Sequence, residues 1–475
     1  MNRRMILRMI GLALLMEAGL MLLPFVAGLC YRERPLAFLV TAGLAGLTGF
    51  CLTRLKVKTN TIYARDGFVA VTLIWVVFSA FGALPFVLSG EIPFYVDAFF
   101  ETMSGFTTTG ASILNNIEGL SHACLFWRSF THWIGGMGVL VFMMAILPLS
   151  GEHSMHIMRA EVPGPVVGKL VPRAGDTAKI LYMLYTGLTV AETVFLMFGG
   201  MSFFDALLHA FGTAGTGGFS TRNNSIAAFQ SDYIEMVISS FLVLFAMNFN
   251  LFYFIVKGKI KTALQSEELH WYAAIILLAT GAIAAGIYSL YGTLGETLKN
   301  AFFNVMTIMS TAGFCTVDYT EWPQYIQVLL VILMFIGGCA GSTGGGLKLS
   351  RVILLIKTSV ADVKRTISPR CVKRVRMDGK CVPDNVLTTV GTFFFLYLFL
   401  LLGCTLVASF DGFDFTTSFT AALSCISNVG PGLSHVGPSY NFADFSTLSK
   451  VVMSVTMLAG RLEIYPLLIL FMPKK

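Results

Sequence analysis

The chain has 475 residues, of which 55% are hydrophobic and only 12% are charged. A soluble domain of ordinary composition carries about 25% charged residues, so these proportions exclude a soluble fold and predict an all-α integral membrane protein. The formal net charge is +7, and the Lys and Arg residues responsible for it collect between apolar segments. That distribution is typical of membrane topology, and nucleic-acid binding is not needed to explain it.

A helix that crosses the hydrocarbon layer needs about 20 apolar residues. Ten stretches meet this requirement, so we predict ten transmembrane helices. They lie near residues 7–29, 36–53, 68–89, 124–149, 179–199, 233–256, 271–291, 325–356, 385–409 and 447–472. The first follows Arg3 and Arg4, as a signal peptide would, but its apolar stretch exceeds the roughly 7–15 residues of a signal sequence, which favours a membrane helix.

Basic residues define the predicted orientation. Lys and Arg gather in the even-numbered connections, at residues 54–65, 159–179, 257–261 and 357–376, and at both chain ends. Because cytoplasmic loops carry an excess of Lys and Arg, we expect these connections and both termini on the cytoplasmic side. The odd-numbered connections then face outward.

Four short segments in the outward connections repeat one pattern. They read DAFFETMSGFTTTGA (97–111), DALLHAFGTAGTGGF (205–219), NAFFNVMTIMSTAGF (300–314) and TSFTAALSCISNVGP (417–431). Each is too short to cross about 30 Å of hydrocarbon, so we expect a short helix that enters the membrane and turns back. Re-entrant backbone is tolerated only where protein or water satisfies its polar groups, so we expect the four loops to surround one ion pathway in a pseudo-fourfold arrangement.

Aligned without gaps, the segments share a glycine column, and the residues before it are small, neutral and mostly hydroxyl- or amide-bearing. Together they form the candidate cation-binding set: Thr107, Thr108, Thr109, Gly110, Gly215, Thr216, Gly217, Gly218, Ser310, Thr311, Ala312, Gly313, Ser427, Asn428, Val429 and Gly430. No carboxylate occurs among them, so backbone dipoles would hold the ion, which suits a large monovalent cation better than a divalent one. The shared glycine allows a positive φ.

Chance is the alternative explanation, because 46 glycines produce accidental alignments and small residues also help membrane helices to pack. Four matches in register, all on the outer side and each followed by a predicted span, favour the ion pathway.

The eighth predicted span contains the glycine-rich stretch GGCAGSTGGGLK at residues 337–348. Glycine destabilises helices, so we predict a break there. The stretch resembles the phosphate-binding pattern GxxxxGK[ST], but Lys348 arrives one residue late, no Ser or Thr follows it and no strand is predicted before it. The sequence therefore favours a break in a membrane helix over a nucleotide site.

Arg461 and Glu463 interrupt the last predicted span. A charge near the middle of the membrane is costly and normally faces a partner or a water-filled pathway. A structural ion pair of Arg461 with Glu463 or another acid is one interpretation. The other is a functional charge on the ion pathway.

Five further acids are less informative. Asp97, Glu101 and Asp205 lie in or near the short helices and could raise the cation concentration at the mouth. An N-cap role is equally consistent for the two Asp residues. Glu17 and Glu192 are intramembrane acids without an evident partner.

The His and Cys residues give no metal or disulfide framework. His153 and His156 form an isolated HxxH pair, which favours a solvated loop over a metal site. The nine Cys residues are scattered mostly through apolar spans, and only Cys371 and Cys381, in the longest basic loop, form a pair of interest. No nucleophile–base pair or dinucleotide fingerprint occurs, so we do not expect an enzyme.

The motifs SGFTTTGA, STAGF and SNVGPG together resemble those of the Trk/Ktr/HKT superfamily of potassium transporters, most closely its TrkH-type members, and the resemblance covers essentially the whole chain. It implies four M1-P-M2 pore repeats, as in a potassium channel folded into one polypeptide, with two additional N-terminal helices. The corresponding units are 1–60 for the N-terminal helices and 61–150, 151–260, 261–380 and 381–475 for the repeats.

This resemblance implies potassium uptake across the bacterial plasma (inner) membrane, with no covalent cofactor. In the family the four filter glycines select potassium, and plant relatives with serine in the first loop pass sodium more freely. The glycine-rich break and the arginine of the last span are implied to gate the pore beneath the filter. The gate residues are Gly337, Gly338, Gly341, Gly344, Gly345, Gly346, Lys348 and Arg461.

The resemblance also implies partners. Its members form homodimers on a cytosolic ring of TrkA-like nucleotide-binding subunits that sense NAD or ATP. The basic residues 357–380 are a candidate contact surface for such subunits.

Two transport mechanisms remain open. A channel-like transporter conducts potassium down its electrochemical gradient, whereas a symporter couples it to a proton or a sodium ion and needs a titratable acid in the route. The candidate loops lack such an acid, which favours conduction. A receptor or scaffold without transport does not explain four matched re-entrant loops.

Overall fold

The computed structural model describes residues 2–57, 63–138, 174–368 and 374–472. This part of the chain is mostly helical, as predicted. His153, His156 and Cys371 lie outside the described residues, as does the second part of the predicted span 124–149.

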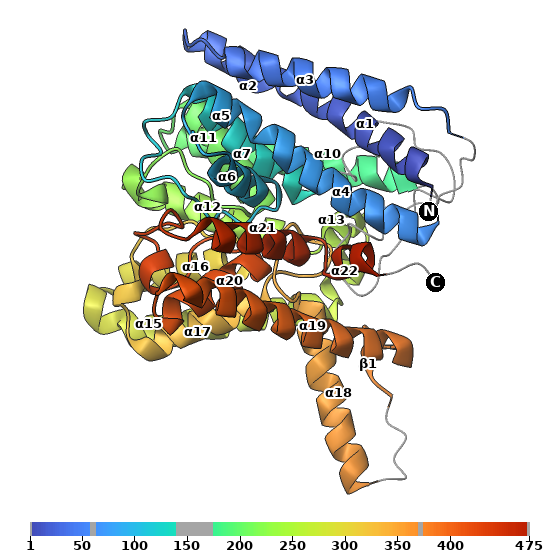
Figure 1. Ribbon diagram of the computed structural model, residues 1–475. Helices are drawn as coiled ribbons and strands as arrows, with labels where there is room; N and C mark the ends of the chain where they lie inside the picture. The colour runs from blue at the N-terminus through green and yellow to red at the C-terminus, as the bar shows by residue number, and fades with distance from the viewer. Residues whose placement is uncertain (1, 58–62, 139–173, 369–373, 473–475) are drawn as a thin grey trace.

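A layer of N-terminal helices covers one side of the molecule (Figure 1). It contains α1 (Arg3–Leu20), α2 (Leu22–Cys30) and α3 (Leu36–Thr53). α1 and α3 pack closely because glycines face each other where they cross: a β-carbon at Gly11 would lie 2.8 Å from the carbonyl oxygen of Gly49. This packing is the use of small residues expected between membrane helices.

The other α-helices of the described residues range from 5 to 25 residues in length. In chain order they are α4 (Ala64–Gly82), α5 (Leu84–Ser89), α6 (Tyr95–Phe106), α7 (His122–Gly136), α10 (Ala174–Phe198), α11 (Phe203–Gly215), α12 (Asp232–Phe245), α13 (Phe249–Val256), α14 (Ile260–Leu264), α15 (Glu267–Tyr291), α16 (Leu294–Met309), α17 (Gln324–Ile336), α18 (Leu349–Ile367), α19 (Asp384–Ala408), α20 (Phe415–Ser427), α21 (Thr447–Arg461) and α22 (Tyr465–Phe471). A small hairpin of β1 (Arg376–Met377) and β2 (Lys380–Cys381) precedes α19.

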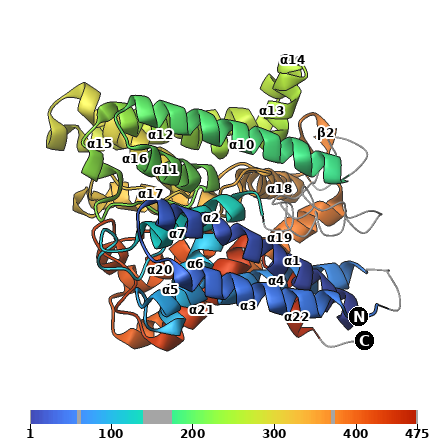
Figure 2. The ribbon, with the colours of Figure 1, turned by 90° about the horizontal axis from the view of Figure 1, so that it is seen from above.

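The four short helices α6, α11, α16 and α20 lie inside the molecule, while α3, α10 and α15 lie at its periphery (Figure 2). Each short helix contacts a helix from the preceding part of the chain: α11 packs on α7, α16 on α12, and α20 on α17. α6 closes the circle by packing on α21 near the C-terminus. Segments far apart in the sequence therefore meet around one centre.

Within the described residues, six helical stretches are long and apolar enough to cross a membrane. They are Arg3–Cys30, Leu36–Thr53, Arg65–Ser89, Ala178–Phe198, Glu267–Tyr291 and Asp384–Asp411. A seventh is obtained if α12 and α13, which bend by 89° at their junction, form one span. The predicted count of ten is therefore not reached by length and composition alone. The predicted spans 325–356 and 447–472 are each divided into two shorter helices, and only the first part of the predicted span 124–149 lies within the described residues.

Two of the helix interruptions were not predicted from the sequence. Between α12 and α13, the carbonyl oxygen of Ala246 accepts a hydrogen bond from the backbone N of Cys339 (3.0 Å), in a distant segment of the chain. Between α21 and α22, Glu463 and Ile464 have φ values of 59° and 65°. Positive φ is unfavourable for a β-branched residue, so the surrounding packing maintains this break.

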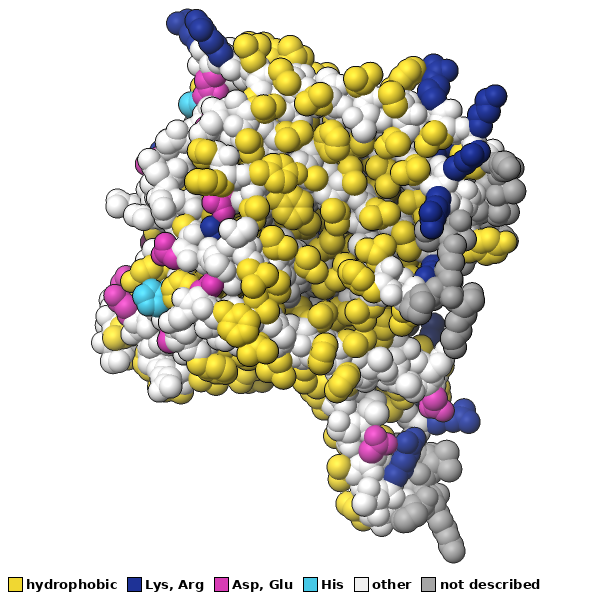
Figure 3. Space-filling view, viewed as in Figure 1, with side chains coloured by type: hydrophobic (Ala, Val, Ile, Leu, Met, Phe, Trp, Pro, Cys, Tyr) yellow, Lys and Arg dark blue, Asp and Glu magenta, His cyan; other side chains and the backbone are white. Residues whose placement is uncertain are grey.

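The surface separates charge from apolar side chains (Figure 3). Yellow apolar side chains cover the middle of the visible face, Lys and Arg gather at the end where the chain termini lie, and Asp and Glu gather mainly at the opposite end. Large apolar side chains such as Leu278 (74% exposed) and Phe395 (68%) point outward. Exposed apolar surface of this kind is what lipid covers.

Candidate functional site

The four glycine loops share one backbone conformation. We call them loop 1 (107–110), loop 2 (215–218), loop 3 (310–313) and loop 4 (427–430). The shared glycine has a positive φ in every loop, as predicted: 80° at Gly110, 80° at Gly218, 75° at Gly313 and 103° at Gly430. The residue two positions earlier also has a positive φ, from 53° to 64°, at Thr108, Thr216, Thr311 and Asn428. This second feature was not predicted. For non-glycine residues it costs roughly 1–2 kcal/mol each, so tertiary contacts must hold the loops.

The loops meet in a closed ring. Each loop glycine packs against the carbonyl oxygen of the residue that precedes the glycine of the next loop, so a β-carbon at the glycine would collide with that oxygen. The pairs are Gly110 with Gly217, Gly218 with Ala312, Gly313 with Val429, and Gly430 with Thr109. The order runs through all four loops and returns from loop 4 to loop 1, so carbonyl oxygens of four chain segments lie around one centre.

Side chains anchor the loops from within the protein. Asn428 Nδ2 donates to Thr109 Oγ1 and to the carbonyl oxygen of Met457, both at 2.9 Å. The Thr107 hydroxyl donates to the carbonyl oxygen of Met103 (2.7 Å) and lies 2.8 Å from Thr109 Oγ1. Because these polar side chains are occupied in protein hydrogen bonds, the backbone carbonyls are the better candidates for ion ligands.

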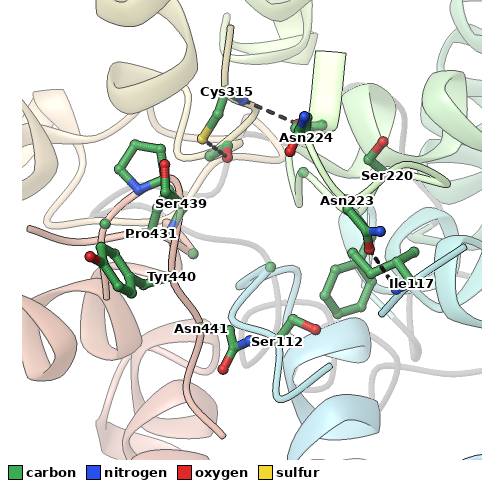
Figure 4. A pocket seen from close by; sticks show the side chains of 18 of the residues that line it. Ser112, Ile117, Ser220, Asn223, Asn224, Cys315, Pro431, Ser439, Tyr440 and Asn441 are labelled. Atoms are coloured by element: carbon green, nitrogen blue, oxygen red, sulfur yellow. Dashed lines mark hydrogen bonds between the residues drawn. The ribbon is translucent and has the colours of Figure 1, made fainter. Parts of the chain in front are cut away.

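An outer cavity of about 460 Å³ lies on the glycine side of the ring and is lined by all four loop glycines. Figure 4 shows side chains from the segments after the glycines pointing into this space, among them Ser112, Asn223 and Asn441. The lining mixes polar uncharged side chains, glycines and apolar side chains, and its charged members include Arg128, Arg222 and Asp318.

Asp318 joins two of the segments around the outer cavity. Its carboxylate accepts hydrogen bonds from the hydroxyl groups of Ser439 (2.6 Å) and Thr320 (2.5 Å). Burial raises the pKa of Asp318, but these hydrogen bonds outweigh burial and hold the pKa below its ordinary value. The carboxylate is therefore ionised at neutral pH and stabilises the outer mouth.

Residues 337–348, here called the inner loop, lie on the other side of the ring. The predicted helix break is present, since α17 ends at Ile336 and α18 begins at Leu349. The backbone N of Gly345 donates to Thr311 Oγ1 (2.6 Å), and that of Gly346 donates to the carbonyl oxygen of Ser427 (2.8 Å). The inner loop thus contacts the first half of loops 3 and 4, through Thr311 and Ser427, whereas the outer cavity contacts the glycines at which these loops end.

Arg461 bridges the inner loop and α7. Its guanidinium donates to the carbonyl oxygen of Thr343 in the inner loop (2.7 Å) and to those of Gly135 and Gly136 at the end of α7 (both 2.5 Å). The side chain is buried, with 7% of Arg461 exposed. A guanidinium with several carbonyl acceptors is a stable way to keep a positive charge inside a protein.

The segment 47–475 of the chain matches the family described as TrkH, cation transport protein. The chain belongs to the TrkH family. It is 37% identical to the Trk system potassium uptake protein TrkH of Salmonella typhimurium and to that of Escherichia coli strain K12, in both cases over 100% of this chain and 99% of the relative. It is 35% identical to the uptake protein TrkG of Escherichia coli, over 98% of this chain and 97% of TrkG.

The fold of this TrkH-family chain is similar to a solved structure. The crystal structure of the potassium transporter TrkH from Vibrio parahaemolyticus matches with a TM-score of 0.90 and 35% identity, over 100% of this chain and 99% of that one. The predicted family and the predicted transporter class are therefore confirmed, since these relatives are named as transporters and not as enzymes.

Glu463, the acid predicted as one alternative partner of Arg461, forms an ion pair with Arg351 in α18 of this TrkH-family chain. The Arg351 guanidinium also lies 4.1 Å from the ring centre of Phe393. Lys348 ends the inner loop and donates to the carbonyl oxygen of Gly344. The predicted gate residues thus lie together, and Glu463 holds the adjacent α18.

The N-cap role considered for Asp97 and Asp205 is wrong. Phe94 and Ser202 occupy the N-cap positions of α6 and α11, and both Asp residues lie in the first helical turn. Asp97 forms an ion pair with Lys450 of α21 at 2.7 Å instead. The other three acids considered in the sequence analysis are fully buried: Glu101, Glu17 and Glu192.

Sequence reasoning missed Arg128 and His132 in α7, which are 3% and 0% exposed and lie beside loops 1 and 2. Their signal was present in the sequence. Arg and His four residues apart inside an apolar segment lie on one face of a helix, and polar residues inside a membrane span usually mark a functional position.

Proposed function

We propose that this chain is a channel-like potassium uptake protein in which loops 1 to 4 form the selectivity filter. The observation that carries the proposal is the closed ring of glycines and carbonyl oxygens. Four segments in the same conformation can replace the water around a dehydrated cation with backbone oxygens, as in potassium-selective pores. The names of the relatives, potassium uptake proteins, support potassium as the transported ion.

The arrangement proposed for the whole chain is ten membrane-crossing segments, with four pore repeats around a pseudo-fourfold axis. Its support is the circular packing in which α11, α16 and α20 each lie on a helix of the preceding part of the chain and α6 lies on α21. Segments interrupted by loops cross the membrane as pairs of shorter helices, which is tolerated where the irregular backbone is covered by protein. The N-terminal layer of α1 to α3 precedes the repeats.

The short helices favour a cation at the centre of the ring. Their C-terminal ends, which carry a partial negative charge, lead directly into the four loops. None of the sixteen predicted filter positions carries a carboxylate, so the ion would be held by dipoles. Neutral carbonyl ligands suit potassium better than a strongly hydrated divalent ion.

The inner loop and Arg461 are proposed to gate the pore. The inner loop is bonded to loops 3 and 4 through Gly345 and Gly346, and Arg461 ties it to α7. An element that contacts the filter but contains six glycines (337, 338, 341 and 344–346) can change conformation at low cost. Its withdrawal would open the path below the filter.

We propose the bacterial plasma membrane as the location, with both chain ends in the cytoplasm. The gathering of Lys and Arg at the end of the molecule where the termini lie supports this orientation (Figure 3). α18 projects away from the body next to the β1–β2 hairpin (Figure 1). This basic segment is the proposed contact surface for cytosolic TrkA-like subunits, which would sense NAD or ATP, in a homodimeric assembly. Purification from the native membrane without such a subunit would count against the partner.

The test is isotope uptake in cells that lack their own potassium systems. We expect uptake of rubidium, competed by potassium more strongly than by sodium, and a loss of this potassium preference in Gly218→Ala, whose side chain would meet the carbonyl oxygen of Ala312. Reversal potentials that follow potassium alone when external pH and sodium are varied would support conduction. A shift with pH or sodium would show coupled transport instead, and absent uptake at normal protein level would refute the proposal.

A further inference from the structure

A buried ion pair between α6 and α7 lies beside loops 1 and 2. Arg128 Nε of α7 is 2.6 Å from Glu101 Oε1 of α6, and the two side chains are 2% and 0% exposed. Burying two charges is costly unless further hydrogen bonds satisfy both groups. The other hydrogen bonds of the carboxylate and of the guanidinium therefore show which segments the ion pair holds in place.

Glu101 holds the chain that leaves loop 1. Its Oε1 accepts a hydrogen bond from Ser112 Oγ and its Oε2 accepts one from the backbone N of Ile113, both at 2.9 Å. These residues follow Gly110 by two and three positions. The carboxylate thus ties the exit of loop 1 to its own short helix.

Arg128 holds the chain that leaves loop 2. Its Nη1 donates to the carbonyl oxygen of Ser220 (3.0 Å), two residues after Gly218. Its guanidinium also lies 3.5 Å from the ring centre of Phe219, a cation–π contact in a desolvated site. One arginine therefore connects the surroundings of both loops, because its partner Glu101 holds the segment that follows loop 1, and Phe219 and Ser220 directly follow loop 2.

His132, one turn further along α7, fills the space behind loop 2. Its ring stacks on Phe219 at 4.1 Å between ring centres, with an interplanar angle of 15°. A β-carbon at Gly217 would overlap the His132 ring, and one at Gly215 would meet the His132 carbonyl oxygen. Loop 2 therefore lacks side chains at two positions where loop 1 carries threonine, because α7 occupies that space.

On the basis of the filter proposed above, we propose that Glu101 and Arg128 are positioning residues that set the spacing of loops 1 and 2. Phe219 supports them as the ring on which the Arg128 guanidinium lies. The spacing of the two loops in turn sets the discrimination between potassium and sodium. Gly110 packs directly on the carbonyl oxygen of Gly217, so any relaxation of this contact moves filter carbonyls. A looser ring can close around the smaller sodium ion.

The test measures reversal potentials in proteoliposomes with potassium on one side and sodium on the other. We expect Arg128→Gln and Glu101→Gln to lower the potassium-to-sodium permeability ratio by about tenfold, which corresponds to about 1.4 kcal/mol. Arg128→Lys retains the charge but not the two-sided hydrogen bonding, so an intermediate ratio is expected. A merely structural pair would change the amount of folded protein and leave this ratio unaltered.

A second variant covers the case in which the charge variants do not fold. Phe219→Leu keeps both charges and removes only the ring beneath the guanidinium, so it is expected to lower the ratio by a smaller factor. Lys299→Gln is the matched control, because it breaks a partly exposed ion pair with Glu235 (3.1 Å) between α16 and α12. Its ratio is expected to equal that of the wild type.

Two results overturn the inference: an unchanged ratio in the folded Arg128, Glu101 and Phe219 variants, or an equal loss of selectivity in Lys299→Gln. A wild-type protein that does not distinguish potassium from sodium would instead refute the proposed filter. The two failures are therefore distinguishable in one set of recordings.

Discussion

Replacing Arg461 with alanine is expected to increase cation flux. The guanidinium donates to Thr343 in the inner loop and to Gly136 in α7, and Gly136 in turn packs directly on Gly215 of loop 2. In the proposed pore, an ion that leaves the ring on this side therefore passes close to a fixed positive charge. The substitution removes that charge and also releases the inner loop from α7.

The size of the effect follows from the charge. For a closest approach of about 7 Å and an effective dielectric constant of about 20, the repulsion is about 2.4 kcal/mol, or about 50-fold in rate. The carboxylate of Glu463, two residues along the chain, offsets part of this field, so we expect an increase of between about fivefold and 50-fold. Arg461→Lys keeps the charge while losing most of the carbonyl contacts, and we expect a much smaller increase.

The assay is rubidium-86 uptake into proteoliposomes, normalised to the amount of folded protein. Comparing the alanine and lysine variants separates the effect of the charge from that of the hydrogen bonds between Arg461 and the inner loop and α7, because only alanine removes both. Flux in Arg461→Ala that is unchanged or lower than in the wild type, at equal incorporation, would refute the reasoning and remove Arg461 from the pathway. Equal increases in both variants would assign the effect to the lost hydrogen bonds with the inner loop and α7.

Three further predictions concern the loops. Gly218→Ser is expected to reduce the potassium preference measured by competition uptake, because its side chain meets a carbonyl of the next loop and its φ of 80° disfavours any side chain. Thr311→Val removes the hydrogen bond to Gly345, so the inner loop is expected to open more often and basal flux to rise severalfold, as the loss of about 1 kcal/mol predicts. The lowered pKa of Asp318 predicts a contribution to thermal stability that is complete above about pH 4 and is lost as the pH falls through the native pKa, so Asp318→Asn is expected to lose less stability on acidification than the wild type.

Each of these has its own control. For the filter glycine, Gly281→Ser in α15 adds the same side chain where no atom lies within 4 Å, and retained selectivity there is required. For the inner loop, Thr311→Ser keeps the hydroxyl, so a rise in flux equal to that of valine would contradict the assigned hydrogen bond. For the outer mouth, a melting temperature that falls with acidification equally in wild type and Asp318→Asn would show that other groups are responsible.

The four loops were predictable because the pattern is local and repeated. A shared glycine column, small neutral neighbours and short flanking segments indicated re-entrant loops and a positive φ at Gly110, Gly218, Gly313 and Gly430. The positive φ at the threonines and the asparagine two positions earlier was not predictable, because those residues disfavour it in isolation. Contacts with distant segments, such as that of Asn428 with Thr109, impose it.

For the inner loop, too, the sequence predicted the backbone break but not the contacts that hold it. Its glycines predicted the break between α17 and α18, but nothing in that segment indicates which residues it will contact. The breaks near Ala246 and Glu463 were missed because their stabilising partners lie elsewhere: Cys339 of the inner loop for the first and Arg351 of α18 for the second. A local propensity cannot report a hydrogen bond to a residue that is remote in sequence.

By itself, the sequence determined the environment of the chain, the apolar helices, the orientation suggested by basic residues and the positions of the glycines, because hydrophobicity and backbone freedom are properties of short segments. Only the tertiary structure decided that the glycines meet carbonyls of neighbouring loops in cyclic order, that Arg461 bonds backbone carbonyls, and that Arg128 joins loop 1 to loop 2. These contacts span up to several hundred residues of sequence. They arise because buried polar groups in a membrane protein must find partners inside the fold.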